Sequence, residues 1–167
     1  MNLTIKNLTK TVLFFLVMVV FTTSCSTSKV ATPSKRSLKG YWNLNTVTYS
    51  ESGIYNVNLF NDVSSECMVG SSWRFIPNNN TGNYNIQAPN CNTGERHFVW
   101  SVDGSTGDES NYDILLKPTD EKNKSETNKG FRLQVSYLSE SAITLRQTVQ
   151  SNGKPFTITM NFTKNIN

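Results

Sequence analysis

The sequence has little of what catalytic and metal sites need. Its 167 residues include one histidine, His97, and only three cysteines. A Ser/His/Asp triad would have to use His97, which strand alternation places on the opposite face from Trp100, towards solvent. No nucleophile-elbow motif accompanies it. The loop acids Asp120, Glu121 and Glu126 are scattered rather than spaced for calcium. We therefore expect no enzyme activity, no metal and no cofactor.

The chain also lacks a basic face. Its formal net charge is +4, but the positive charges gather near the N-terminus. Without Lys6, Lys10, Lys29, Lys35 and Arg36, the 16 basic residues become 11, against 12 acidic residues. The remaining domain should carry a net charge near −1, which is 11 minus 12, and we expect it to bind no nucleic acid.

No apolar run is long enough to span a membrane as a helix. The longest, TVLFFLVMVVF at 11–21, has about half of the ~20 residues that a spanning helix needs. Two lysines precede it, and the small residues TTS follow it. A positive start, a short apolar core and a small-residue cleavage region predict a signal peptide over 1–24.

Cys25 directly follows this cleavage region. Thr22-Thr23-Ser24-Cys25 resembles a bacterial lipobox, the motif cut before a cysteine that becomes lipidated, although Thr22 stands where an aliphatic residue is usual. Several acyl chains on Cys25 would anchor the protein stably, whereas one chain binds a membrane only marginally. The alternative is a secreted protein with Cys25 as a spare thiol. Segment 25–37 is too poor in apolar residues to fold and is expected to be a flexible tether.

The tether also bears on the compartment. No acidic cluster follows Cys25, and in some bacterial groups such a cluster exports lipoproteins to the cell surface. We therefore expect an outer-membrane lipoprotein that faces the periplasm.

In the periplasm, the remaining cysteine pair, Cys67 and Cys91, is most simply a disulfide. Neither a nearby histidine nor a short CxxC spacing favours a metal or redox pair.

The rest of the chain, 38–167, alternates apolar and polar residues with a period of two. In FRLQVSY at 131–137 every second residue is apolar, which is typical of a half-buried antiparallel strand. Asn152-Gly153 is a hairpin signal, because both residues tolerate positive φ. The strands expected along the chain are 40–49, 54–60, 72–76, 83–88, 97–102, 112–116, 131–137, 143–149 and 156–162.

Helices are nearly absent, and only a single turn is expected within 62–70. About eight strands in sequential hairpins predict a single all-β, up-and-down antiparallel β-barrel over 38–167, because closure removes the sheet edges. A β-sandwich is the alternative. Segment 117–129 is polar throughout and predicts an exposed loop.

The segment LKGYWNL at 38–44 carries a family resemblance. A Gly-x-Trp at the start of the first strand resembles the opening motif of lipocalins. The resemblance extends beyond this motif to Cys67, SSWRFIPNNNTGNYNI, Cys91, GERHFVW and KPFTITMNFTK. Over 38–164 the chain therefore resembles lipocalin-like, calycin-type lipoproteins of Bacteroidetes-type bacteria.

The resemblance implies a plug at the closed end of the barrel. Trp42 would fill that end, and a basic side chain from the last strands, Arg146 or Lys164, would pack over its ring. Strand alternation points Arg146 outward, which favours Lys164 as the cation.

Two functions follow for such a barrel. The resemblance implies a small hydrophobic ligand inside it, and the candidate wall residues are Trp73, Phe75, Trp100, Phe131, Tyr137, Gln147 and Met160. The alternative is a packed barrel that acts as a protein-interaction or inhibitor module through loops 104–111 and 117–129. In both cases we expect a monomer.

Lipidation of Cys25 gives the first testable prediction. Cys25→Ala is expected to abolish incorporation of a radiolabelled fatty acid, because the substitution removes the thiol that the motif modifies. Metabolic labelling followed by isolation of the protein would measure this. Labelling that Cys25→Ala leaves unchanged would contradict the lipoprotein prediction.

Overall fold

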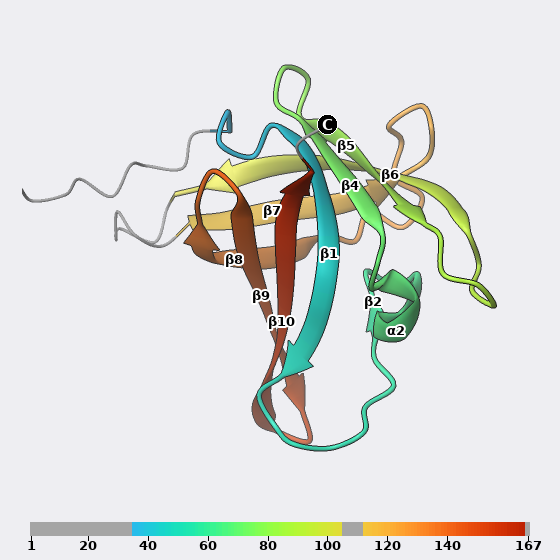
Figure 1. Ribbon diagram of the computed structural model, residues 1–167, viewed down its shortest axis with the longest axis vertical. Coiled ribbons are helices and arrows are strands. Elements are labelled where there is room, and N and C mark those ends of the chain that lie inside the picture. Colours follow the sequence, from blue (N-terminus) through green and yellow to red (C-terminus); the bar gives the residue numbers. More distant parts are fainter. Residues whose placement is uncertain (1–34, 105–111, 166–167) are drawn as a thin grey trace, which may run out of the picture. The chain divides into compact units, whose positions relative to one another are not determined.

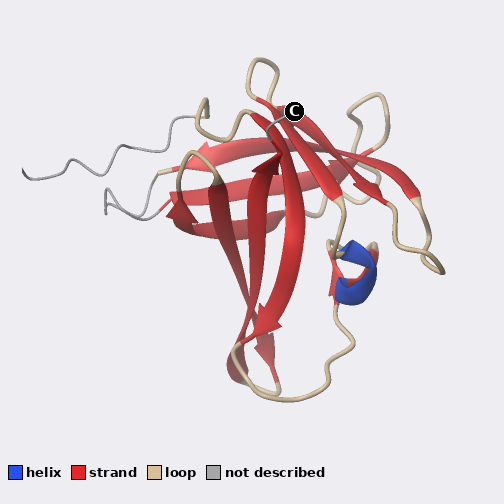
Figure 2. Cartoon of the chain, in the orientation of Figure 1, coloured by secondary structure: helices blue, strands red, loops and turns tan. Residues whose placement is uncertain are grey.

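The computed structural model describes residues 35–104 and 112–165 (Figure 1). The predicted signal peptide, Cys25, most of the predicted tether and residues 105–111 of one predicted interaction loop lie outside these ranges. Within the described part of the chain, no helix is long and apolar enough to cross a membrane. Most of that part is in strands, which are joined by loops and one short helix (Figure 2).

Eight antiparallel strands form a closed barrel in the order β1-β10-β9-β8-β7-β6-β5-β4. Successive barrel strands pair with each other along the sequence. β1 pairs with both β4 and β10, which closes the barrel. The all-β up-and-down barrel is therefore confirmed. The barrel strands are β1 (Gly40–Tyr49), β4 (Ser72–Ile76), β5 (Thr81–Ile86), β6 (Gly94–Asp103), β7 (Tyr112–Thr119), β8 (Phe131–Leu138), β9 (Ala142–Ser151) and β10 (Lys154–Asn165).

Strand alternation places the core inside this barrel. In β10, Phe156, Ile158, Met160 and Phe162 are buried while the residues between them are not. The opposite faces of a pleated strand explain this pattern. The turn into β10 also forms as expected, because Asn152 and Gly153 have φ of 51° and 76°, the left-handed values of a tight hairpin.

The predicted strand at 54–60 is wrong. Only Asn58–Leu59 is extended there, as β2, and it pairs with β3 (Val63–Ser64) outside the barrel sheet. The expected helical turn follows as α2 (Ser65–Met68). The strand ends because Phe60 and Asn61 have φ of 54° and 57°. Two left-handed residues in succession reverse the chain instead of extending it.

Alternation also fails at Tyr137, which was expected to face inward. Its side chain is 56% exposed. The β8–β9 register shifts between Val135 and Tyr137, and such a bulge moves every following side chain to the other face.

The closed end of the barrel contains the expected plug. The Trp42 side chain is fully buried, and its indole N–H donates to the carbonyl of Leu38 at 2.9 Å. The Lys164 ammonium lies 5.2 Å from the centroid of the Trp42 ring. Arg146 is exposed on β9 and pairs there with Thr159 and Gln134. Lys164 is therefore the cation over the plug, and Arg146 is not.

Trp42→Ala is expected to lower the free energy of unfolding by about 3 to 5 kcal/mol, because it leaves a large cavity at the closed end. Urea unfolding followed by circular dichroism would measure it. Trp42→Phe, which keeps a ring there, should cost clearly less. Equal and small effects of both substitutions would contradict a buried plug.

Candidate functional site

The opposite end of the barrel is its mouth, and segment 50–71 lies there. β1 ends at Tyr49 and β4 begins at Ser72, so the chain between them stays at this end, with β2, β3 and α2 (Figure 1). Loops 87–93 and 120–130 border the same end because they join β5 to β6 and β7 to β8. These connections, rather than the strands, shape any opening into the barrel.

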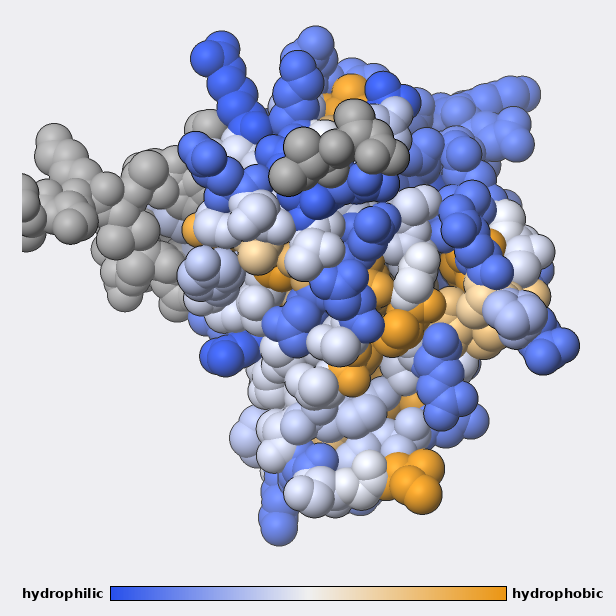
Figure 3. Space-filling model, viewed as in Figure 1, coloured by the Kyte–Doolittle hydropathy of each residue, from blue (hydrophilic) through white to orange (hydrophobic). Residues whose placement is uncertain are grey.

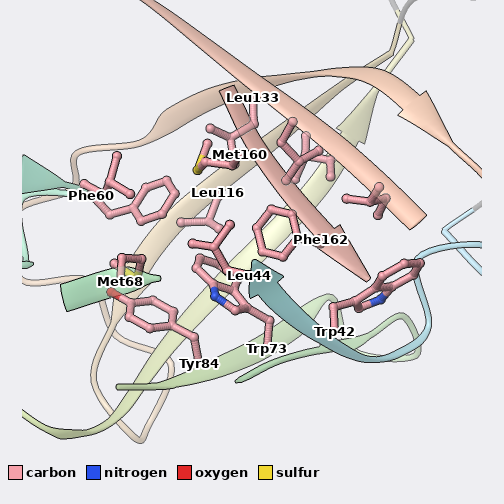
Figure 4. Close-up of a cluster of buried hydrophobic side chains, with 14 of the residues drawn as sticks. Trp42, Leu44, Phe60, Met68, Trp73, Tyr84, Leu116, Leu133, Met160 and Phe162 are labelled. Carbon is pink, nitrogen blue, oxygen red and sulfur yellow. The ribbon is translucent and has the colours of Figure 1, made fainter. Parts of the chain in front are cut away.

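The ring of Phe60 occupies the mouth. It is 3% exposed, and its centroid lies 5.3 Å from that of Phe131 and 5.6 Å from that of Trp73, both in edge-to-face contact. Tyr84 completes the group, stacked on Trp73 at 4.5 Å. Figure 4 shows Phe60 in one cluster with Trp73 and Tyr84. Such contacts contribute about 0.5 to 1.5 kcal/mol each beyond area burial.

Below this level, the described interior is filled by side chains. Of the predicted ligand-wall residues, Trp73, Phe75, Trp100 and Met160 are each at most 3% exposed. Phe75 meets the Trp100 ring at 5.3 Å. Water hardly reaches these side chains, and the rings of Trp73, Phe75 and Trp100 pack against one another. Gln147 is half-buried on β9, and Tyr137 lies outside the barrel.

The open space is at the mouth itself. A pocket of about 430 Å³ lies there, and Phe60, Tyr84 and Phe131 contribute aromatic walls. Of the predicted wall residues, only Phe131 takes part. Pro118 and a set of polar and charged side chains form the rest of the lining: Asn61, Asp62, Arg96, His97, Thr119, Asp120, Glu126, Thr127 and Lys129.

Asp62 makes polar contacts with two other side chains that line this pocket. Its carboxylate accepts a hydrogen bond from the Tyr84 phenol at 2.9 Å and pairs with Arg96 Nε at 3.1 Å. Burial raises the pKa of Tyr84, and the neighbouring Asp62 charge raises it further, while Arg96 opposes the shift. Asp62 is two residues from Phe60, so these bonds tie segment 50–71 to β5 and β6.

A disulfide gives the segment a second attachment. Cys67 in α2 is bonded to Cys91 in the loop before β6, with their Cα atoms 5.7 Å apart, as predicted. Closing a loop of this length stabilises the fold by roughly 3 to 4 kcal/mol in the chain-entropy model. The Tyr49 and Ser65 hydroxyls add a 2.6 Å hydrogen bond between β1 and α2.

Several mouth residues were missed because no local pattern marks them. Phe60 was expected in a strand, and Asp62 in a helical turn, with no site role for either. The available signal was the run Phe60-Asn61-Asp62, because asparagine and aspartate favour turns and left-handed backbone.

Among the described residues, no group of three or more His, Cys, Asp or Glu is placed to hold a metal ion.

Comparison with known proteins gives similarities of architecture only. No protein-family description and no curated protein matches the chain. A lipocalin-like protein from Bacteroides uniformis shares 15% identity at a TM-score of 0.45, over 77% of this chain and 99% of the other. Bovine odorant binding protein, in complex with a selenium-containing odorant, shares 12% identity at a TM-score of 0.45, over 80% and 74%. The first carries the description that the sequence resemblance suggested.

The raised pKa of Tyr84 predicts a stability change at high pH. The unfolded chain loses this proton near pH ~10 and the folded chain only at higher pH, so the stabilisation is complete below pH ~10 and is lost above it. Tyr84→Phe should therefore flatten the alkaline fall in stability, by up to about 1.4 kcal/mol per pH unit. Urea unfolding in a Cys25→Ala background would measure it, with Tyr137→Phe as the matched control for an exposed phenol. An unchanged slope in Tyr84→Phe would contradict it.

Proposed function

We propose that this protein is a lipid-anchored protein of the bacterial envelope that binds a small, mainly apolar molecule at the mouth of its barrel. The observation that carries the proposal is the pocket of about 430 Å³ with walls from Phe60, Tyr84 and Phe131. Ligand sites are typically concave, largely apolar, and of roughly 300 to 1,000 Å³. The ligand is placed at the mouth because the described interior beneath is packed.

The rim of the pocket supports a ligand with one polar end. Asp62 and Arg96 neutralise each other there. Glu126 and Lys129 also line the pocket, and neither forms an ion pair with another described residue. An apolar body against the rings, with a polar group at this rim, would satisfy both kinds of surface.

The backbone at Phe60 supports a ligand that can extend deeper. Phe60 and Asn61 are both in the left-handed region. Asparagine adopts this conformation readily, whereas it costs roughly 1 to 2 kcal/mol for a residue such as phenylalanine. A ligand whose apolar group replaces the Phe60 ring would release this strain if the Phe60 backbone returned to negative φ. The core rings beneath would then face the ligand.

The proposed anchor is compatible with access to this site. The chain enters the barrel at its closed end, because Gly40 begins β1 beside the Trp42 plug. The mouth is formed at the other ends of the strands. The described residues before Gly40 therefore join the barrel at the end away from the mouth.

A packed interaction module is the second candidate function. It is favoured by the burial of the interior side chains, which leaves little internal space in the described barrel. The exposed β7–β8 loop, 120–130, would then be the contact surface, as polar loops on a rigid scaffold often are.

Binding at the mouth can be tested with a neutral fluorescent probe, N-phenyl-1-naphthylamine. We expect saturable binding that Phe131→Asp weakens at least about tenfold, because the charge would be desolvated beside the rings. Tyr137→Asp is the matched control, since the same change is made on β8 but outside the barrel, and it should leave binding intact.

The natural ligand can be sought in the same protein. Native mass spectrometry of a Cys25→Ala form purified from the periplasm, followed by solvent extraction, should show a small molecule that leaves on denaturation. No saturable probe binding, together with a purely ligand-free mass, would overturn mouth binding in favour of the packed module.

A further inference from the structure

A second hollow lies on the outer face of the barrel, where β1 and β4 separate. Their pairing runs only from Gly40 opposite Phe75 to Asn43 opposite Ser72. Beyond it, Leu44 bonds to the backbone of Gly70 and Ser71, and β1 bulges against β10 between Leu44 and Thr46. A groove of about 680 Å³ lies along this part of β1. Figure 3 shows this side of the molecule, with hydrophilic surface next to an apolar patch.

The groove has no charged wall. Its lining contains amides, a hydroxyl, a phenol and aliphatic groups, but no Asp, Glu, Lys, Arg or His. The mouth pocket, by contrast, is lined by both acidic and basic side chains. Without a charged residue in its lining, the groove has no strong preference for an ion over a neutral molecule. A neutral ligand is therefore the chemistry that it fits.

Four polar side chains in the groove are uncommitted. Asn43, Ser72, Gln87 and Asn165 line it, and none makes a side-chain hydrogen bond to another described residue. Only Asn45 is engaged, with the Thr163 hydroxyl at 3.0 Å. An amide offers two donors and an acceptor, and a hydroxyl offers both functions. Such groups match the adjacent hydroxyls of a sugar, each of which also donates and accepts.

An apolar platform lies beside these amides. Tyr41 is 50% exposed and Val69 is 36% exposed, and both line the groove. The Arg74 guanidinium lies over one face of the Tyr41 ring, 5.2 Å from its centroid, a contact worth about 0.5 to 1 kcal/mol at an exposed site. A ligand would therefore stack on the opposite face. An aromatic face carries negative potential, so it attracts the C–H groups on one side of a pyranose ring.

From these features together, we propose that the groove between β1 and β4 binds a neutral carbohydrate. Sugar hydroxyls would bond to Asn43, Gln87 and Asn165, while a C–H face would lie on Tyr41. This site is separate from the mouth pocket, with which it shares no lining residue.

The test is a titration of the ¹⁵N-labelled protein with maltotriose, cellotriose, chitotriose and raffinose, each up to about 20 mM, which covers millimolar affinities. At least one sugar should shift the side-chain amide signals of Asn43, Gln87 and Asn165 in a saturable way. Gln87→Ala and Tyr41→Ala should each weaken binding by about fivefold, as expected for one lost net contact. Gln150→Ala, the same change at an exposed site outside the groove, should not.

Three results would overturn the proposal. The first is the absence of saturable shifts with all four sugars. The second is equal affinity in wild type and Gln87→Ala. The third is binding of uncharged, capped trialanine but of no sugar, which would identify a peptide groove instead.

Discussion

The barrel depends on one short contact, the pairing of β1 with β4. Four residue pairs, from Gly40–Phe75 to Asn43–Ser72, close the sheet. Without them, the first and last strands in the barrel order would be edges that expose unpaired backbone groups. Trp42 and Trp73 are directly opposite each other in this seam, and both are buried. The seam is therefore stabilised by side-chain burial as well as by backbone hydrogen bonds.

The same closure decides where binding can occur. A barrel of eight strands has an interior just wide enough for side chains or one small ligand. Here the aromatic residues that stabilise the core also occupy its space, as the contacts among Trp73, Phe75 and Phe98 show. Open volume lies at the mouth under segment 50–71, along the outer seam where β1 leaves β4, and beside β6 and β7.

Segment 50–71 shows how irregular chain is held at a barrel mouth. Its regular structure is limited to β2, β3 and one helical turn, so its position rests on tertiary contacts. The Cys67–Cys91 disulfide, the Asp62 bonds to Tyr84 and Arg96, and burial of Leu59 and Met68 supply them. These contacts compensate for the left-handed backbone that directs the Phe60 ring into the mouth.

The sequence by itself determined the elements that depend on local pattern. Period-two alternation located the eight barrel strands, Asn152-Gly153 located a hairpin, and an even cysteine pair in a chain with a predicted signal peptide located the disulfide. Each is encoded within a few residues or by a count. The resemblance at Gly40 to Trp42 predicted a plug, and of the two candidate cations only Lys164 lies over the buried Trp42 ring.

Tertiary structure alone decided the candidate sites. Tyr137 faces solvent because one bulge reverses the alternation, and a single-residue shift cannot be read from a repeating pattern. Phe60 reaches the barrel mouth only because its backbone turns left-handed. Asp62 meets Arg96 across 34 residues of sequence. Strand patterns predict which face a side chain occupies. Bulges, the left-handed residues at Phe60 and Asn61, and the β1–β4 pairing decide which side chains meet.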